Sequence, residues 1–502
     1  MAKKSSTPSY TVEYALSFDD ANASSVLDKL DKVAIDIYND VLGEGLKRLH
    51  KVQHDLAYMS ALAEYRKLCR KSKLSKGDIR LKAQLSHIMS DACRYHGFSE
   101  YALHSYSAVP RKHFLDASGK PILGSGEAQK LATRAYGALY KLKVGTAKRV
   151  RFYNPKRDLI SIEGKFAGTG VFFDRDELAV RYKNYHFKIV VKRNDQYAMQ
   201  ALGDRVKYVR LKPRIIRGKK KWFAQLVFEG IPPQKNRVYG EDIPQGIDIG
   251  VSTIAVSNKN EAHLYELAPE CTTDERKLRR IERKMDRSKR ATNPDNYNPD
   301  GTNKTGKHEW KFSNNYKKLR AERTEVYRKL AIKRKMSHEL LANKIIASGT
   351  DIRVEKMQFR GLQKRSKKTT KKNDGRFNSK KRYGKTLSNR APAMMLTIIN
   401  RKLSYKNMQL KEVDTFSVKA SQYNPLDETY RRKTLKERLD KLAEGIIVQG
   451  DMLSAFVLEH VEQDLRTINK QQCKQDFNRF KCLQDIEVTQ LKEKGQLTWY
   501  IS

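Results

Sequence analysis

The chain has 502 residues, 39% of them apolar, and its 102 Lys and Arg against 57 Asp and Glu give a formal net charge of +45. This length and apolar content suit two to four domains with real cores and exclude a disordered chain. Because an unneutralised charge of this size opposes compaction, the composition favours a polyanionic partner, without distinguishing RNA from DNA.

No membrane span or secretion signal is expected from the sequence. No run of about 18 apolar residues occurs, and the first residues lack the apolar centre of a signal peptide. The five cysteines are scattered and form no C-x-x-C pair, which is typical of reduced thiols in a cytoplasmic protein. The expected location is therefore the cytoplasm, at the nucleoid when the protein is bound to DNA.

The first half of the chain changes period twice. Residues 8–18 alternate and predict a strand, residues 19–142 follow helical spacing, and residues 144–230 alternate again. Several short strands with basic turns indicate a small β-barrel, residues 1–18 and 143–235, into which the helical block 19–142 is inserted. The expected strands are 150–153, 159–163, 169–173, 187–191, 206–211 and 221–228, and the clearest inserted helices are 81–95 and 127–142.

The second half mixes strands and helices from residue 240 to 502. Residues 246–257 and 262–267 predict a two-stranded hairpin, and helices at 275–285 and 315–347 predict a helical hairpin within the range 275–348. The remaining expected elements are a strand at 351–357, a helix at 392–403, a strand at 408–413 and a helix from 435 onward. Together they indicate a multi-domain α/β protein.

Residues 363–390 form the most basic segment, with 12 Lys or Arg and a single acid. In isolation this segment is a loop, and its charge density favours contact with phosphates over a merely solvated surface. Phe377 and Tyr383 within it suit either base stacking or ordinary packing. The expected nucleic-acid contacts are Lys367, Lys368, Lys371, Lys372, Lys380, Lys381 and Arg382.

Three carboxylates stand at the ends of apolar segments. Asp248 lies in Gly246-Ile-Asp-Ile-Gly250, Glu355 follows the apolar residues of the strand at 351–357, and Asp451 precedes an apolar helix. Each has an ordinary interpretation when taken alone: a turn aspartate, a surface glutamate and a helix N-cap. The Gly-x-Asp-x-Gly pattern also opens the actin-like and sugar-kinase ATPases, but the glycine-rich phosphate loop that those chains need is missing here.

Three converging carboxylates can hold two divalent cations about 3.5–4 Å apart, an arrangement that cleaves phosphodiesters. Hard oxygen ligands suit Mg²⁺, whereas the 11 His residues show no clustered ligand pattern. In so basic a chain, this chemistry points to a nucleic-acid substrate.

These segments resemble the TnpB proteins of bacterial insertion sequences and the type V CRISPR effector nucleases. The resemblance covers residues 240–460 and rests on four motifs, with only the architecture matching before residue 240. The motifs are the Gly-Ile-Asp-Ile-Gly strand, the basic helix from Lys277, Val354-Glu-Lys-Met357 with Gly361-Leu362, and Asp451-Met-Leu-Ser-Ala455.

The resemblance implies a ribonuclease H-like (RuvC) nuclease domain over 240–502, a wedge barrel and a helical recognition domain. It also implies that Asp248, Glu355 and Asp451 are the catalytic, metal-binding carboxylates. The first two would bind metal and activate water, and Asp451 would complete the second metal site.

One departure concerns zinc. The family usually carries a four-cysteine zinc ribbon just before the third carboxylate, but residues 417–449 contain no cysteine. We therefore expect no structural zinc, and a remnant of the insert held together by Leu426, Tyr430, Leu435 and Leu439.

The expected function is RNA-guided, Mg²⁺-dependent DNA cleavage beside a short adjacent motif, with a guide RNA and double-stranded DNA as partners. The alternative is a guide-dependent DNA-binding protein that does not cut. A third possibility, an RNA chaperone, would need none of the three carboxylates.

Overall fold

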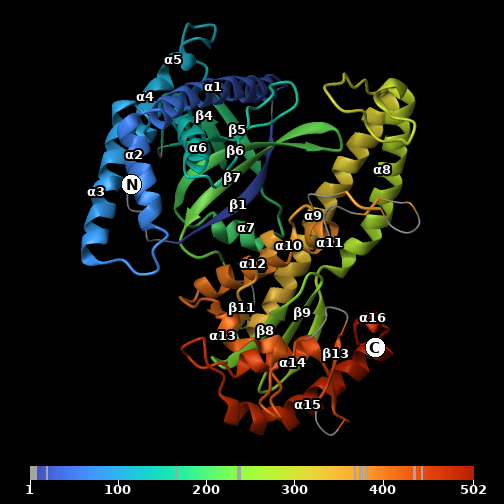
Figure 1. Cartoon of the computed structure of the whole chain (residues 1–502). Coiled ribbons are helices and arrows are strands. Elements are labelled where there is room, and N and C mark those ends of the chain that lie inside the picture. The colour runs from blue at the N-terminus through green and yellow to red at the C-terminus, as the bar shows by residue number, and fades with distance from the viewer. Residues whose placement is uncertain are drawn as a thin grey trace. The chain divides into compact units, whose positions relative to one another are not determined.

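The computed structural model describes residues 8–18, 21–165, 168–233, 239–366, 369–371, 375, 377–378, 383–432, 437–442 and 445–501. The chain divides into two compact units, Met1–Lys235 and Asn236–Ser502 (Figure 1). Among the described residues, no helix combines the length and apolar character needed to cross a membrane. The fold is mixed α/β in two units, and each unit is described below by itself.

The first unit combines a seven-stranded sheet with a group of helices. Its strands are β1 (Ser9–Ser17), β2 (Ile162–Glu163), β3 (Val171–Asp174), β4 (Ala179–Tyr182), β5 (Tyr185–Val190), β6 (Val206–Ile216) and β7 (Lys219–Glu229). Its helices are α1 (Ala21–Gln53), α2 (Leu56–Leu68), α3 (Lys76–Tyr95), α4 (Glu100–Tyr106), α5 (Ala108–Arg111), α6 (Ser125–Lys143) and α7 (Gln196–Ala201).

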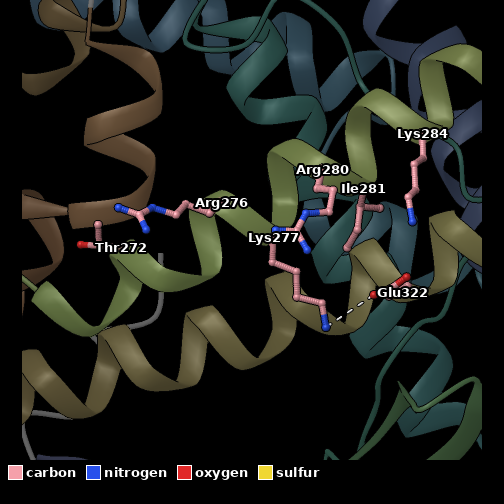
Figure 2. Close-up of a pocket in the computed structure, with 7 residues that line it drawn as sticks. All are labelled: Thr272, Arg276, Lys277, Arg280, Ile281, Lys284 and Glu322. Carbon is pink, nitrogen blue, oxygen red and sulfur yellow. Dashed lines mark ion pairs between the residues drawn. The ribbon is translucent and has the colours of Figure 1, made fainter.

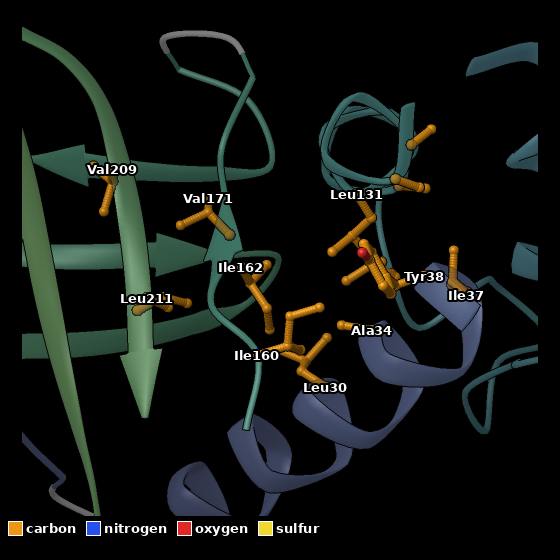
Figure 3. Packing of buried hydrophobic residues seen from close by; sticks show 14 of the residues in the cluster. Leu30, Ala34, Ile37, Tyr38, Leu131, Ile160, Ile162, Val171, Val209 and Leu211 are labelled. Carbon is orange, nitrogen blue, oxygen red and sulfur yellow. The ribbon is translucent and has the colours of Figure 1, made fainter. Parts of the chain in front are cut away.

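The sheet of this unit is nearly a closed barrel. Its strand order is β2-β6-β7-β1-β5-β4-β3, and every pair is antiparallel. The two edges approach each other, because a Cβ on Gly164, directly after β2, would lie 2.0 Å from the carbonyl oxygen of Val171 in β3. Apolar residues of α1 and α6 pack against the strands in one core (Figure 3).

Two strands predicted in this half are shorter or absent. Residues 150–153 form no strand, because the backbone of Tyr153 is bonded to the side chain of Asn39 on α1 instead of to a neighbouring strand. Only Ile162–Glu163 of the strand predicted at 159–163 is extended in the sheet, since the Ile160 N–H is taken by Asp31. Strand β4 and helix α7 were not predicted.

The second unit is built around a five-stranded sheet. Its strands are β8 (Pro244–Ile249), β9 (Thr253–Asn258), β10 (Ala262–Glu266), β11 (Asp351–Glu355) and β12 (Lys411–Val413), with a separate hairpin of β13 (Leu439–Lys441) and β14 (Ile447–Gln449). Its helices are α8 (Thr272–Thr292), α9 (Asn314–Ser348), α10 (Phe359–Leu362), α11 (Gly384–Arg390), α12 (Pro392–Ser404), α13 (Thr415–Val418), α14 (Gly450–Glu459), α15 (Lys470–Glu493) and α16 (Thr498–Ile501). Short 3₁₀ turns cover Pro269–Cys271, Pro294–Asn296 and Ala420–Gln422.

The strand order of the second sheet is β10-β9-β8-β11-β12. The first three strands form an antiparallel meander, and β8, β11 and β12 run parallel to one another. The chain therefore crosses from the meander to β11 through the long helices α8 and α9, which pack on each other as a helical hairpin through the core of Leu278, Ile281, Met285, Val326 and Leu330.

Helices cover both faces of this sheet. On one face, Ile247, Ile249, Ile352 and Val354 pack with residues of α9 and α12, which we call the α9–α12 core. On the other face, residues of β9, β10 and β12 pack with α14, α15 and α16, which we call the α14–α15 core. Because alternate residues of a strand face opposite sides, this division sets the direction of every side chain on β8 and β11.

Three predictions for this half are corrected. Residues 246–257 form two strands and not one, because the chain turns at Gly250, where the Gly250 N–H donates to the carbonyl of Thr253. The segment after residue 437 forms the hairpin β13–β14, and the helix starts only at Gly450. The basic segment 363–390 ends in a helix, α11, which is anchored by bonds from Arg390 to the carbonyls of Leu267 and Ala268.

Candidate active site

Asp248 and Glu355 lie side by side near the ends of two parallel strands. Ile247 of β8 is the register partner of Val354 in β11, so the next residues on both strands are neighbours. Since Ile247 and Val354 face the α9–α12 core, the two carboxylates project from the opposite face, which α14 covers.

Gly246 allows α14 to lie directly against β8. It faces the same way as Asp248, and a Cβ on it would stand only 1.9 Å from the carbonyl oxygen of Ala455. Any larger residue would push the helix away from the strand. Asp451 precedes Ala455 by four residues, about one helical turn. The close contact at Gly246 therefore fixes the position of Asp451 along β8.

Both ends of α14 are fixed. At its start the side chain of Gln449, and not Asp451, is the N-cap, accepting from the Met452 N–H at 2.8 Å. At its end Arg353 of β11 donates to the carbonyl of Glu459 at 2.9 Å, and Ser257 of β9 donates to the Glu459 carboxylate at 2.8 Å. Asp451 therefore occupies the first turn of a rigidly held helix, where the helix dipole favours a negative charge.

The carboxyl group of Glu355 is largely enclosed. Burial raises the pKa of its carboxyl, and a hydrogen bond from the backbone N–H of Ala420 acts in the opposite direction. Its Oε1 is buried without a hydrogen-bond partner among the described residues. A buried, unsatisfied carboxylate oxygen is costly, and a cation is the kind of ligand that would satisfy it.

Asp451 is surrounded by three residues that the sequence did not indicate. The hydroxyl of Tyr500 on α16 donates to Asp451 Oδ2 at 2.5 Å, Thr253 Oγ1 lies 3.5 Å from the same oxygen, and Arg438 Nη1 lies 4.0 Å from Oδ1. No motif marks these residues. Thr253 and Tyr500 are 247 positions apart, and only the fold brings them together.

Asp248 and Glu355 thus project from the sheet face that α14 covers, and Asp451 lies in the first turn of α14. As they stand, no three His, Cys, Asp or Glu side chains within the described residues form a group that could hold a metal ion. The donor set still fits Mg²⁺, because it consists of hard oxygens and includes the unsatisfied Oε1 of Glu355. Metal binding by these residues stays a prediction.

Comparison with known proteins gives structural neighbours only. No protein-family profile matches the chain, and no curated protein matches it. The structural neighbours include two Cas12f complexes.

One neighbour is the Cas12f1–sgRNA–target DNA complex, at 12% identity and a TM-score of 0.43, covering 89% of this chain and 98% of that one. Another is a CRISPR–Cas12f ternary complex, at 12% identity and a TM-score of 0.25, covering 88% of this chain and 85% of that one. Similarity at this level carries no argument about residues or activity.

A second feature of this unit is a basic groove on the helical hairpin. Figure 2 shows its lining, which comes from α8 and α9: Thr272, Arg276, Lys277, Arg280, Ile281, Lys284 and Glu322. Lys277 is paired with Glu322 at 3.4 Å. Arg276, Arg280 and Lys284 are exposed and have no ion pair with any described residue. They recur every fourth position, so they form one stripe along α8.

The predicted contacts in the basic segment fall largely outside the described residues. Lys367, Lys368, Lys372, Lys380, Lys381 and Arg382 lie outside them. Lys371 is described: it is exposed, and its ammonium lies 5.2 Å from the ring centre of Phe377, which is itself half exposed. This pair presents a cation and an aromatic face to solvent, a combination that suits a nucleic-acid strand.

Proposed function

We propose that this protein is an RNA-guided, Mg²⁺-dependent DNA endonuclease that cuts a target beside a short adjacent motif. One observation supports the chemistry above all: Asp248 and Glu355 are register neighbours on parallel strands, on the face where α14 carries Asp451. The strand order β10-β9-β8-β11-β12, with an antiparallel meander followed by parallel strands, supports the interpretation of this unit as a ribonuclease H-like (RuvC) domain.

The residues divide the work between them. Asp248 and Glu355 would hold one Mg²⁺, and Asp451 would complete the site for the second. When bound there, Mg²⁺ would stabilise the charge on the scissile phosphate and lower the pKa of a bound water. Like charges repel one another, so a bound cation would stabilise carboxylates that lie close together.

The nucleic-acid partners rest on charge and on the motif resemblance. A net charge of +45 and the exposed stripe Arg276, Arg280 and Lys284 suit phosphate backbones. The guide RNA and the duplex target come from the resemblance to TnpB and type V effectors, and one structural neighbour is, by its name, a Cas12f1–sgRNA–target DNA complex. In this proposal the guide reads the target and the protein reads duplex shape and a short motif.

The test is single-turnover cleavage by the guide-loaded protein in Mg²⁺. Asp248→Asn, Glu355→Gln and Asp451→Asn should each lower the cleavage rate at least about 1,000-fold, which corresponds to about 4 kcal/mol. Target binding should stay within about twofold, because each change removes a metal ligand and leaves the basic surface intact.

Glu412→Gln provides the matched control. Glu412 lies on β12, pairs in register with Val354, and is exposed, so its loss should leave the rate unchanged. Near wild-type cleavage by any of the three carboxylate variants would refute the site. Guided binding without cleavage by the wild-type protein would favour the non-cutting alternative.

A further inference from the structure

The short helix α16 carries Tyr500, whose hydroxyl is hydrogen-bonded to Asp451, Thr253 and Arg438. Tyr500 of α16 is 3% exposed. Its hydroxyl oxygen accepts from Thr253 Oγ1 at 3.0 Å and from Arg438 Nη1 at 3.0 Å, and the hydroxyl donates to Asp451 Oδ2. The Arg438 guanidinium also lies 4.4 Å from the centre of the Tyr500 ring.

This pattern fixes the direction of the bond to Asp451. A tyrosine hydroxyl has one proton to donate and two positions at which it accepts. Thr253 and Arg438 fill the accepting positions, so the proton is committed to Asp451.

The packing around Tyr500 holds its hydroxyl in one position. Tyr500 and Ile501 belong to the α14–α15 core, together with Met452 and Leu453 of α14. A Cβ on Gly250, two residues beyond Asp248, would lie 3.8 Å from the Tyr500 hydroxyl. Tyr500 therefore stands between the end of β8 and the start of α14, the two elements that carry Asp248 and Asp451.

We propose that Tyr500 is a positioning residue for Asp451, through which the C-terminal helix α16 sets the metal affinity of the carboxylate site. The proposal rests on the proposed function, since it takes Asp451 to be a metal ligand. Tyr500 holds Oδ2 in one orientation, and Oδ1, which lies 4.0 Å from Arg438 Nη1, is the oxygen that would face a cation. Partners behind a metal ligand commonly change metal affinity or activity about 10–100-fold when they are removed.

The experiment measures Mn²⁺ binding to the nucleic-acid-free, full-length protein by electron paramagnetic resonance. Tyr500→Phe keeps the ring and removes only the hydroxyl. We expect the Kd for Mn²⁺ to rise at least about tenfold. In the guide-loaded protein, the half-saturating Mg²⁺ concentration for cleavage should rise by a similar factor, while the rate at saturating Mg²⁺ stays within about threefold of wild type.

Tyr423→Phe is the matched control. Tyr423 is 1% exposed in the same core, and its hydroxyl has no hydrogen-bond partner within the described part of the chain. Removing that hydroxyl should change neither Mn²⁺ affinity nor Mg²⁺ dependence. Thr253→Val, which removes one donor to the Tyr500 hydroxyl, provides a second variant that keeps the tyrosine and should weaken Mn²⁺ binding by a smaller factor.

A double variant shows whether Tyr500 acts through Asp451. Tyr500→Phe added to Asp451→Asn should cause no further loss of Mn²⁺ affinity, because residues that act as one unit are not additive. Wild-type Mn²⁺ affinity in Tyr500→Phe, with weakened binding in Asp451→Asn, would overturn the role of Tyr500 and leave the carboxylate site standing. Unchanged affinity in both variants would overturn the carboxylate site itself, and this inference with it.

Discussion

Some residues of the second unit carry a charge that their neighbours stabilise. His263 of β10 is an example outside the candidate site. Its Nδ1 lies 2.9 Å from a carboxylate oxygen of Glu487 on α15, and its Nε2 lies 3.2 Å from Glu261. The bond to Glu487 is the main reason that the pKa of the His263 imidazole is raised. The ion pair thus ties the edge strand β10 to α15.

His263→Gln should lower the stability of the second unit in a pH-dependent way. Because the folded-state pKa is raised, the stabilisation is fully present below the ordinary value of 6.5 and is lost as the pH rises through the folded-state pKa. A hydrogen bond to a charged group contributes about 1.5–3 kcal/mol. At pH 6 the variant should therefore unfold about 3–12 °C lower than wild type, and by pH 9 the two curves should converge.

Scanning calorimetry at several pH values measures this difference. His87→Gln is a suitable control, because the His87 side chain on α3 is 72% exposed and its pair with Asp91 is solvent-screened. A His263 variant whose deficit is the same at pH 6 and pH 9 would show that the imidazole acts by packing and not by charge.

At the residue scale, the sequence could predict the carboxylates but not their surroundings. Alternation along a strand places Asp248 and Glu355 opposite their apolar neighbours, whatever the rest of the fold does. The contact of Tyr500 with Thr253 and Asp451 depends on a short C-terminal helix folding back over β9, and no periodicity encodes such a contact. The N-cap interpretation of Asp451 fails for a local reason: Gln449 already fills that role.

Among the elements, α8 offers the clearest surface for nucleic acid. Consecutive members of the stripe Arg276, Arg280 and Lys284 are about 6 Å apart along the helix axis, four residues at 1.5 Å each. The apolar side of α8, through Leu278, Ile281 and Met285, packs on α9. The stripe is therefore held by a rigid helix. When nucleic acid binds, only the side chains of the stripe lose conformational freedom, because the backbone is already ordered.

Replacing Arg276, Arg280 and Lys284 by Gln should weaken duplex DNA binding and flatten its salt dependence. Each phosphate contact that is lost should reduce the magnitude of the slope of log K against log salt by about 0.9. The triple variant should therefore reduce it by about 2.7. Binding by fluorescence anisotropy between low and moderate salt measures the slope.

A second triple variant removes the same charge elsewhere. Arg466, Lys474 and Lys492 are exposed on or beside α15, and their replacement by Gln should leave the slope nearly unchanged. Equal slopes for the two triple variants would mean that α8 contributes only general charge and no specific phosphate contacts.

Long periodic elements were predictable from the sequence, and short ones were not. The helices α9 and α12 and the strand β7 follow the expected ranges closely, whereas α8 and β6 extend several residues beyond theirs. The apolar faces of all five elements are long enough to show a period. The turn at Gly250, the absent strand at 150–153 and the hairpin β13–β14 depend on single bonds, such as those from Asn39 to Tyr153. The absence of structural zinc near residues 417–449 stays a prediction, to be tested by elemental analysis.

At the scale of the whole molecule, the main feature is the large excess of positive over negative charge in the chain. The formal charge of +45 is spread over a chain whose described ion pairs already neutralise many of its cations. The positive charges that are not paired repel one another, which opposes the compact state. A bound polyanion would offset this repulsion. Charge alone would bind any nucleic acid, so it does not distinguish a guided nuclease from a general RNA-binding protein.

The RNA that co-purifies with the protein separates these two functions. A guided endonuclease should protect one defined transcript from added ribonuclease, with a structured constant part and a variable end, whereas charge alone would protect a heterogeneous mixture. Sequencing the protected RNA gives the answer. Supplying the same transcript with a new variable end should redirect cleavage to a matching duplex beside a fixed short motif, because base pairing and not protein contact then selects the target. Random protected RNA, together with cleavage that ignores the RNA supplied, would reduce the protein to an unguided nuclease.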